Sequence, residues 1–283
     1  MGVRVFVDSS ADIYGKIAEE TGIIKVPLSV HFGDAVYEDG VDLTPDGFYQ
    51  LLITSHDLPN TSQPSPGDFL NAYRRHSEPG DTIFSFHLSS KLSGTYQSAL
   101  LASRQIDDRD VRVIDTRSAS LGVAMPAIMA TRWATAGNSV ESIEQRTQAM
   151  IQNQSVYFLV DTLDYLHRHG RIGKAQALFG SLLQIKPVLT LDDGVVAPAE
   201  KVRGQNRAIA RLLELVKSKF TPADQLLISV IDAQVPDVAN QLLSDLQVSF
   251  PRAEFLRTTL GPIIGTHTGP GTLGVITNII PAE

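Results

Sequence analysis

The chain has 283 residues, of which 43% are hydrophobic and 19% charged, with a net charge of −7 and a pI near 5.5. This composition is typical of a soluble globular protein and excludes a disordered chain. The absence of cysteine excludes disulfide scaffolds, thiolate zinc sites and cysteine nucleophiles. The acidic balance argues against the broad basic surface of non-specific nucleic-acid binding, so we expect no nucleic-acid partner.

The apolar runs are short, and none approaches the roughly 18 residues that a membrane-spanning helix needs. The chain enters the apolar segment 3–7 almost at once, without the basic region of a signal peptide. We therefore expect a cytoplasmic protein that does not span a membrane. The seven histidines form no HExxH or comparable ligand pattern, so we expect no bound metal.

The first half of the chain alternates strand and helix patterns. In chain order we expect a strand at 4–8, a helix at 14–21, a strand at 24–32, helices at 45–55 and 69–76, a strand at 82–86, a helix at 96–106, a strand at 111–115, and long helices at 119–137 and 140–152. This alternation predicts a mainly parallel sheet covered by helices. Ligands on such sheets bind beyond the carboxyl ends of the strands. Asp8, Ser9 and Ser10 follow the first strand there, and their roles are not predicted.

A second unit is expected to begin near residue 155, which gives domains at 1–154 and 155–283. We expect a strand at 156–160, short helices at 163–169 and 175–183, a hairpin of 186–191 and 195–202 around Asp193-Gly194, a helix at 207–220, a strand at 226–232, a helix at 236–250, and strands at 253–258 and 273–278. The predicted fold class is therefore α/β, with a mainly parallel N-terminal sheet and a mixed C-terminal sheet.

The segment 89–95 is a hydroxyl-rich turn between a predicted strand and a predicted helix. Its side chains and glycine are Ser89, Ser90, Ser93, Gly94 and Thr95. Hydroxyls and unpaired backbone N–H groups at a helix start can bind an anion. Ser93 or Thr95 can equally well cap the helix. The pattern alone leaves both interpretations open.

Two further loops share this character. The loop 60–66 contains the adjacent hydroxyls Thr61 and Ser62, and the glycine-rich loop 265–272 is centred on His267. Ser65 is suited to cap the next helix, with Pro66 at its first position. Capping needs neither the Thr61-Ser62 pair nor an imidazole among glycines. Together these groups could bind one carboxylate or phosphate.

Two other function classes deserve comparison with an anion-binding protein. A serine hydrolase acting on lipid esters is disfavoured because the chain contains no GxSxG motif and offers no identifiable base for Ser93. A binder of another small anion, such as a phosphorylated metabolite, stays open. Candidate phosphate contacts come from two groups of cations: Arg168, Arg171 and Lys174, and Lys201, Arg203, Arg207 and Arg211. Arg171 and Arg203 lie beside glycines, which favours turns over regular helix faces.

Several motifs, in order over nearly the full length, resemble those of the DegV family. They are Val5-Phe-Val-Asp-Ser-Ser-Ala-Asp12, Val26-Pro-Leu28, Tyr37-Glu-Asp-Gly40, Thr61-Ser-Gln-Pro-Ser65, the segment 89–99, Gly170-Arg-Ile172, Lys186-Pro187, Val202-Arg-Gly204 and the loop 265–269. The combination is far more specific than any single motif.

The resemblance implies two α/β domains with a long-chain fatty acid bound between them. It also implies the acyl-binding, non-catalytic subunit of a bacterial fatty acid kinase, which presents the carboxyl group to a separate ATP-binding subunit. No cofactor is implied, and a transient contact with a membrane surface is allowed. The implied carboxylate ligands are Thr61, Ser62, Ser93, the backbone at Gly94, and His267. The implied contacts to the acyl phosphate or the kinase subunit are Arg171, Arg203 and Arg207.

Elementary energetics fit a carrier of this kind. Burying a palmitate-length chain at about 0.8 kcal/mol per methylene gives a gross gain on the order of 10 kcal/mol, before immobilisation costs. The head group then needs only to be oriented. Neutral hydroxyl donors suit that task, because a carboxylate that is not paired with arginine remains nucleophilic towards ATP.

Overall fold

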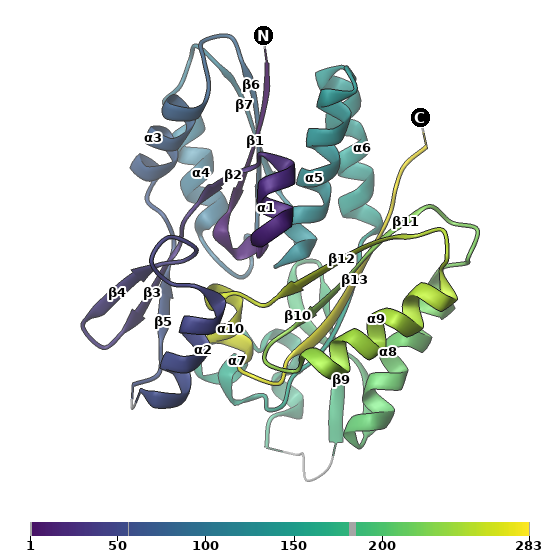
Figure 1. Cartoon of the computed structure of the whole chain (residues 1–283). Coiled ribbons are helices and arrows are strands. Elements are labelled where there is room, and N and C mark those ends of the chain that lie inside the picture. The colour runs from purple at the N-terminus through teal and green to yellow at the C-terminus, as the bar shows by residue number, and fades with distance from the viewer. Residues whose placement is uncertain (1, 56, 181–184, 283) are drawn as a thin grey trace. The chain divides into compact units, whose positions relative to one another are not determined.

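The structure is a computed structural model that describes residues 2–55, 57–180 and 185–282 (Figure 1). The chain divides into two compact units. One consists of the residues up to 152 together with 261–263, and the other of 153–260 together with the residues from 264 onward. No sequence pattern indicated that 261–263 return to the first unit, and the domain boundary expected at residues 154 and 155 stays a prediction.

The first unit contains a four-stranded sheet in the order β2-β1-β6-β7, in which all neighbours are parallel. Its strands are β1 (Val3–Asp8), β2 (Ile24–Val26), β6 (Thr82–His87) and β7 (Asp110–Asp115). The mainly parallel sheet predicted from the alternating pattern is therefore confirmed. Because parallel strands end at one edge, the loops after β1, β6 and β7 all start from the same edge of this sheet.

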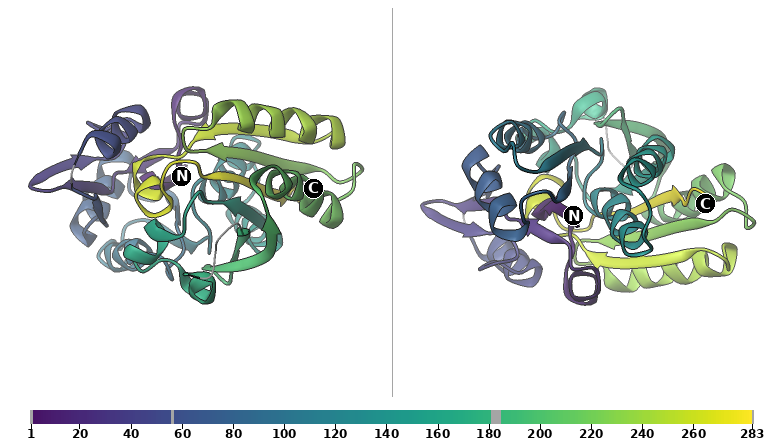
Figure 2. Two further views of the ribbon diagram at one scale, coloured as in Figure 1. Left: turned by 90° about the horizontal axis from the view of Figure 1, so that it is seen from below. Right: turned by 90° about the horizontal axis from the view of Figure 1, so that it is seen from above.

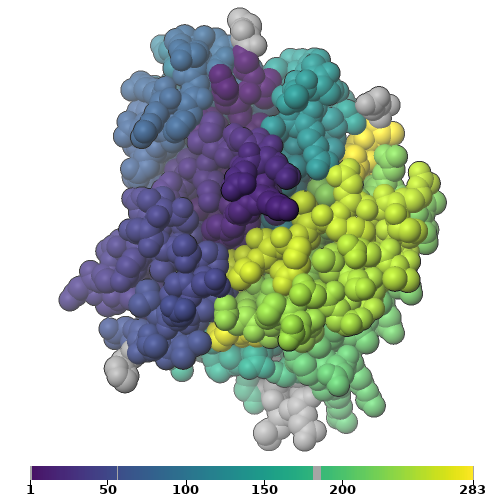
Figure 3. Space-filling model, viewed as in Figure 1, coloured from purple at the N-terminus to yellow at the C-terminus, as the bar shows by residue number. Residues whose placement is uncertain are grey.

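Helices cover both faces of the parallel sheet, as Figure 2 shows. Helices α3 (Pro66–His76) and α4 (Thr95–Ser103) pack on one face, where Phe6 and Ile83 from the strands meet Phe69 and Tyr73. Helix α5 (Leu121–Thr135) packs against β1 and β6, with most of its side chains buried, and α6 (Val140–Asn153) follows it. The short helix α1 (Gly15–Thr21) has no buried side chain and lies on the surface of the unit (Figure 3).

A second, antiparallel sheet in the first unit corrects part of the sequence prediction. It consists of β3 (Ser29–Phe32), β4 (Ala35–Glu38) and β5 (Asn60–Ser62), in the order β4-β3-β5. The single strand predicted at 24–32 is wrong, because Pro27 and Leu28 separate β2 from β3. Proline has no N–H to donate to a strand neighbour, so the ladder of β2 ends there. Helix α2 (Pro45–Thr54) lies between β4 and β5 in the chain.

The second unit is built on a six-stranded mixed sheet, as predicted, in the order β10-β9-β8-β13-β11-β12. Its strands are β8 (Ser155–Leu159), β9 (Ile185–Asp192), β10 (Val195–Arg203), β11 (Leu226–Asp232), β12 (Glu254–Thr259) and β13 (Leu273–Ile279). Only the β11–β12 pair is parallel among these described strand pairs. Asp193 and Gly194 both have positive φ, 49° and 78°, which produces the predicted tight hairpin between β9 and β10.

Two helices pack on this sheet and supply its core. Helix α8 (Gln205–Lys219) contributes Leu212 and Val216, and α9 (Pro236–Ser249) contributes Leu242 and Leu246. The two helices contact each other. Each carries its apolar residues at helical spacing, so one face of each helix is buried and the opposite face is exposed.

Three segments of the second unit bear on the site. Helix α7 spans Asp164–Arg168, as expected for the segment 163–169. The helix predicted at 175–183 is a short 3-10 helix, η2 (Gly173–Leu178), and residues 181–184 lie outside the described chain. The glycine-rich loop predicted at 265–272 is wrong in its first half, because α10 (Pro262–Thr268) contains His267. Proline suits the first helical position, and packing of the buried Ile263 can offset the propensity cost of the internal glycine.

None of the described helices combines the length and the apolar character needed to cross a membrane.

Candidate functional site

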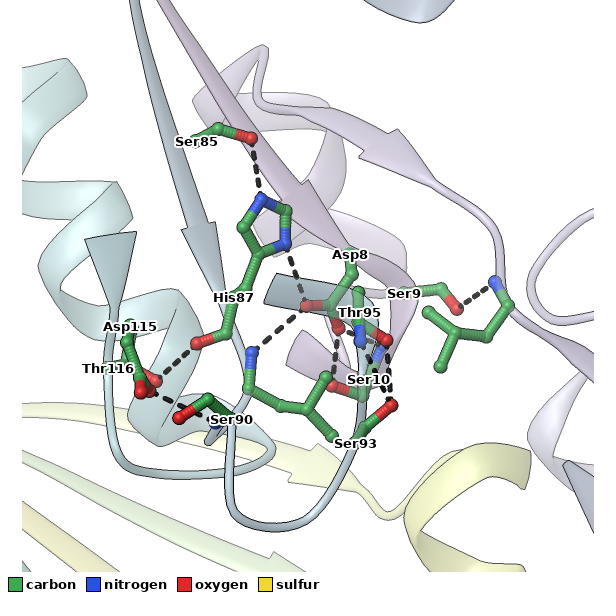
Figure 4. A network of polar contacts seen from close by, with 12 residues as sticks. Asp8, Ser9, Ser10, Ser85, His87, Ser90, Ser93, Thr95, Asp115 and Thr116 are labelled. Carbon is green, nitrogen blue, oxygen red and sulfur yellow. Dashed lines mark hydrogen bonds and ion pairs between the residues drawn. The ribbon is translucent and has the colours of Figure 1, made fainter. Parts of the chain in front are cut away.

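The centre of the candidate site is a pair of hydroxyl groups at the start of α4 (Figure 4). Ser93 Oγ and Thr95 Oγ1 lie 2.9 Å apart, and the Thr95 amide donates to Ser93 Oγ at 3.3 Å. Gly94 is the capping residue, and no side chain provides the usual capping bond. The bond between the two hydroxyls uses the hydrogen of one of them. The hydrogen of the other can therefore be donated to an anion.

The two other serines of the turn have structural contacts. Ser89 is fully buried; its amide donates to Ser118 O at 2.8 Å, and its Oγ accepts from the Lys91 amide at 3.2 Å. The amide of Ser90 donates to the Asp115 carboxylate at 3.3 Å. These contacts fix the path of the loop that leads to Ser93.

Gly94 allows the loop 60–66 to approach the start of α4. A Cβ atom at position 94 would lie 2.3 Å from Gln63 Oε1, a distance that no real contact has. The amide of Gln63 also donates to Ser98 Oγ in α4 at 3.1 Å. Gln63 therefore joins the Thr61-Ser62 segment to the Ser93-Gly94 turn, and sequence reasoning missed it because no local pattern marks such a contact.

Thr61 and Ser62 lie in β5 and not in the irregular loop that was predicted. They pair with Val30 and Ser29 of β3. Ser62 is exposed, and its Oγ lies 2.9 Å from His31 Nε2. His31 was not predicted as a site residue, because it sits in an alternating apolar pattern that indicates only a strand.

Asp8 connects the loop after β1 to the loop after β6. Its carboxylate is fully buried; Oδ1 accepts from the Ser10 amide at 3.1 Å and from Ser10 Oγ at 2.5 Å, while Oδ2 accepts from the Leu88 amide at 3.0 Å. His87 Nδ1 lies 3.1 Å from the same Oδ2 (Figure 4). Nearby, Ser9 Oγ accepts from the Leu28 amide at 3.0 Å. The residues Asp8, Ser9 and Ser10 thus have an architectural role that the sequence did not reveal.

A second group of buried carboxyl groups lies in the same unit. Burial raises the pKa of Asp39 to about 6, although Ser9, the Tyr14 hydroxyl at 2.9 Å, and Lys25 lower it. Burial also raises the pKa of Asp12 well above its usual value, although Asp12 accepts hydrogen bonds from Ser120 and from the amide of Gly261. The first unit therefore contains two carboxyl groups whose pKa values burial raises above the usual value of aspartate.

His267 contacts a second imidazole within the second unit. The His169 and His267 rings meet edge to face, with centroids 5.0 Å apart at 81°. Burial, with smaller effects of His169 and Arg171, lowers the pKa of His267 to about 3. His267 is therefore neutral at physiological pH and can offer one N–H donor and one lone pair. Ser93 belongs to the first unit, so the structure describes the two parts of the predicted ligand set separately.

The predicted cations fall into two classes. Lys174 pairs with Asp192, and Arg211 pairs with Glu200 at 2.6 and 2.7 Å, so these two have structural roles. The other five predicted cations have exposed side chains: Arg168, Arg171, Lys201, Arg203 and Arg207. Within the described chain, no ion pair is formed by Arg203 or Arg207.

Arg203 also lines a cavity of about 440 Å³ together with Lys186, Gly204 and Gln205. Gly204 and Gln205 are the capping and first residues of α8, so the start of this helix lines the cavity. Of the two cations that line it, Lys186 already pairs with Asp161 at 2.7 Å. Arg171 contacts the carbonyl of His169 at 2.6 Å and lies outside this cavity. Sequence reasoning placed the three arginines together as one functional class; the structure associates Arg171 with α7 and Arg203 with α8.

Comparison with known proteins gives consistent results. A family model described as "Uncharacterised protein, DegV family" matches residues 2–278. A fatty-acid-binding DegV family protein from Thermus thermophilus is 36% identical, with coverage of 99% of this chain and 100% of that chain, and a TM-score of 0.91. DegV from Bacillus subtilis, a fatty acid binding protein, is 34% identical over 99% of both chains, with a TM-score of 0.92.

A further similar structure identifies a ligand. The stearic acid-binding protein from Eubacterium ventriosum is 26% identical, with coverage of 99% of this chain and 98% of that chain, and has a TM-score of 0.89.

Among the described residues, no group of three or more metal-binding side chains is arranged to hold a metal ion.

The contact between Gln63 and position 94 gives a test of how the two hydroxyl segments are held together. Gly94→Ala should destabilise the protein by up to about 1 kcal/mol, because the new methyl group displaces the Gln63 amide and breaks its hydrogen bond to Ser98. Gly67→Ala in α3 is the matched control, since its Cβ meets nothing closer than Ser65 Oγ at 3.5 Å. Urea unfolding of both variants measures the difference. Equal midpoints would contradict the assigned contact.

The raised pKa of Asp39 predicts a pH dependence of stability. Because the folded state holds this proton more tightly than the unfolded state, the free energy of unfolding should fall as pH rises from about 4 to about 6. The full effect is at most about 3 kcal/mol. Asp39→Asn should flatten this part of the profile, as measured by urea unfolding at several pH values. An unchanged slope in the variant would assign the dependence to other groups.

Proposed function

The chain belongs to the DegV family, and from this membership we propose that it binds a long-chain fatty acid and presents the carboxyl group to a separate ATP-binding kinase subunit. In this proposal the chain is not itself an enzyme. The similar proteins from Thermus thermophilus and Bacillus subtilis are fatty acid binding proteins, and the match to each extends over 99% of this chain.

The proposed carboxylate ligands are Thr61, Ser62, Ser93, the Gly94 backbone and His267. The observation that carries this proposal is the Ser93–Thr95 hydroxyl pair, which leaves one O–H hydrogen for an anion and which Gln63 links to the Thr61-Ser62 segment. A hydrogen bond to a charged group contributes about 1.5–3 kcal/mol, so a few such donors can orient a carboxylate whose acyl chain supplies most of the affinity. His267 is proposed to contribute a further neutral donor.

Neutral donors also suit the chemistry of phosphoryl transfer. The carboxylate must attack the γ-phosphorus of ATP, and its nucleophilicity falls when a guanidinium group neutralises it. The described hydrogen bonds of Ser93 and Thr95 involve no arginine or lysine side chain. A carboxylate bound by these hydroxyls would keep its negative charge available for the reaction.

Arg171, Arg203 and Arg207 are proposed to contact the acyl phosphate or the kinase subunit. All three side chains are exposed, and Arg203 lines a cavity together with Lys186 and the start of α8. Such an environment favours a phosphoryl group or an acidic protein surface over a fatty acid tail. The described hydrogen bonds of Ser93 Oγ are with Thr95, which supports a binding role over that of a nucleophile with its own histidine base.

Replacement of Ser93 tests the proposed carboxylate site. Native mass spectrometry of the purified wild-type protein should show a bound fatty acid of about 16–18 carbons, and Ser93→Ala should lose most of it because a donor is removed. Ser90→Ala is the control, since the turn uses the amide of Ser90 and its side chain is exposed. Equal lipid content in both variants would remove Ser93 from the site, and a lipid-free wild-type protein would contradict the proposed function.

Replacement of His267 tests its contribution to transfer. His267→Ala should slow acyl-phosphate formation by roughly 10- to 100-fold when a bacterial fatty acid kinase subunit and ATP are supplied, which corresponds to one lost hydrogen bond to a charged group. Trapping of the acyl phosphate with hydroxylamine measures the rate. His76→Ala, which changes an exposed histidine in α3, should leave the rate unchanged. A normal rate for His267→Ala would limit this residue to a structural role in α10.

A further inference from the structure

The contact between Ser93 and Thr95 involves two different groups of Thr95. The Thr95 amide donates to Ser93 Oγ at 3.3 Å, and the Thr95 hydroxyl lies 2.9 Å from the same oxygen (Figure 4). The two residues differ in exposure, because Thr95 is fully buried and Ser93 is only half-buried. This difference decides which of the two hydroxyls donates to the other.

Each hydroxyl has one hydrogen and two lone pairs that can accept hydrogen bonds. If Ser93 donated to Thr95, the hydrogen of Thr95 would be buried without an acceptor, since Thr95 Oγ1 has no other hydrogen bond within the described residues. Such a buried donor is disfavoured. If Thr95 donates to Ser93, the buried hydrogen is satisfied. The remaining hydrogen then belongs to the half-buried Ser93, where water or a ligand can accept it.

This direction restricts what Ser93 can offer a ligand. Both lone pairs of Ser93 Oγ are occupied, one by the amide and one by the hydroxyl of Thr95. Ser93 Oγ can therefore donate to a ligand but cannot accept from one. The amide of the adjacent Gly94 is a second donor, and within the part of the chain that is described it donates to no acceptor. The turn therefore favours a head group that only accepts hydrogen bonds.

We propose that Thr95 is a positioning residue that determines the head-group specificity of the carboxylate site. By donating to Ser93, it makes Ser93 a dedicated donor, so that the site selects a fatty carboxylate over a fatty alcohol of the same length. The alcohol has a hydrogen of its own to donate, and Ser93 offers it no acceptor. Thr95 acts through Ser93 and does not touch the ligand. The inference rests on the proposed function for the identity of the ligand.

Threonine suits this task because its side chain is rigid. The branched Cβ restricts rotation of the side chain, and burial keeps water from competing for the hydroxyl. Valine has a similar shape without the hydroxyl, and serine keeps the hydroxyl without the methyl group. Thr95→Val and Thr95→Ser therefore separate the donor from the packing of the side chain.

The direction of the hydrogen bond can be measured in the wild-type protein. Neutron diffraction from perdeuterated crystals should show the deuterium of Thr95 Oγ1 pointing to Ser93 Oγ. A deuterium that points from Ser93 to Thr95 would overturn the inference. This measurement needs neither a variant nor a fatty acid, so it separates the failure of this inference from the failure of the proposed function.

Competition between two ligands tests the consequence for specificity. The protein is incubated with an equimolar mixture of palmitic acid and hexadecanol, and native mass spectrometry gives the ratio of the two complexes. The wild-type protein should carry mainly the acid. In Thr95→Val the acid-to-alcohol ratio should fall by roughly 3- to 10-fold, because the lone pair freed on Ser93 can accept one neutral hydrogen bond from the alcohol. Thr95→Ser should restore the ratio of the wild-type protein.

The ratio distinguishes this role from a loss of packing, which would weaken the binding of both ligands equally. Thr147→Val is the matched control, since Thr147 is also a fully buried helical threonine and its hydroxyl donates to Glu144 O at 2.9 Å. In a Ser93→Ala background, Thr95→Val should change the ratio no further, because Thr95 acts only through Ser93. An unchanged ratio in Thr95→Val, or a further fall in the Ser93→Ala background, would overturn the proposal.

Discussion

One buried carboxylate, that of Asp8, ties together the loops on which the proposed site depends. It lies at the end of β1 and accepts from the amide that follows β6 and from the amide and hydroxyl of Ser10. Burying a carboxylate is costly unless its oxygens accept hydrogen bonds, and here two backbone amides donate to them. Burial of Asp8 therefore constrains the loop geometry, because these donors must stay within hydrogen-bond reach of its oxygens.

The two units offer an anion different chemistry. The first unit presents neutral hydroxyls at the start of α4, and the second presents exposed arginines and a neutral imidazole. A carboxylate and a phosphorylated carboxyl group differ mainly in charge and size. Weak neutral donors suit the carboxylate, because they preserve its nucleophilicity. Cations suit the phosphorylated carboxyl group, because they stabilise its added charge. The proposed function assigns each environment to the species that it fits.

The regular elements were predictable from sequence because apolar alternation and helical spacing depend on local burial. The parallel sheet, the mixed sheet and the Asp193-Gly194 hairpin followed from such patterns. Contacts between distant segments were not predictable. Gln63 beside Gly94 has no local signature, since the contact depends on how β5 and α4 pack. The single strand predicted at 24–32 was wrong because the apolar pattern does not register the missing N–H of Pro27. The loop predicted at 265–272 was wrong in its first half because its glycines were read as a turn without regard to the residues before them.

The contact between Gln63 and Gly94 has a consequence for sequence change. A side chain at position 94 needs the space that Gln63 occupies, and Gln63 in turn contacts Ser98. A substitution at 94 therefore displaces the Gln63 side chain and its bond to Ser98, whereas a smaller residue at 63 would lower the cost of a later change at 94. The cost of a substitution at 94 therefore depends on the residue present at 63, so the order in which the two positions change affects the stability of the intermediate sequence.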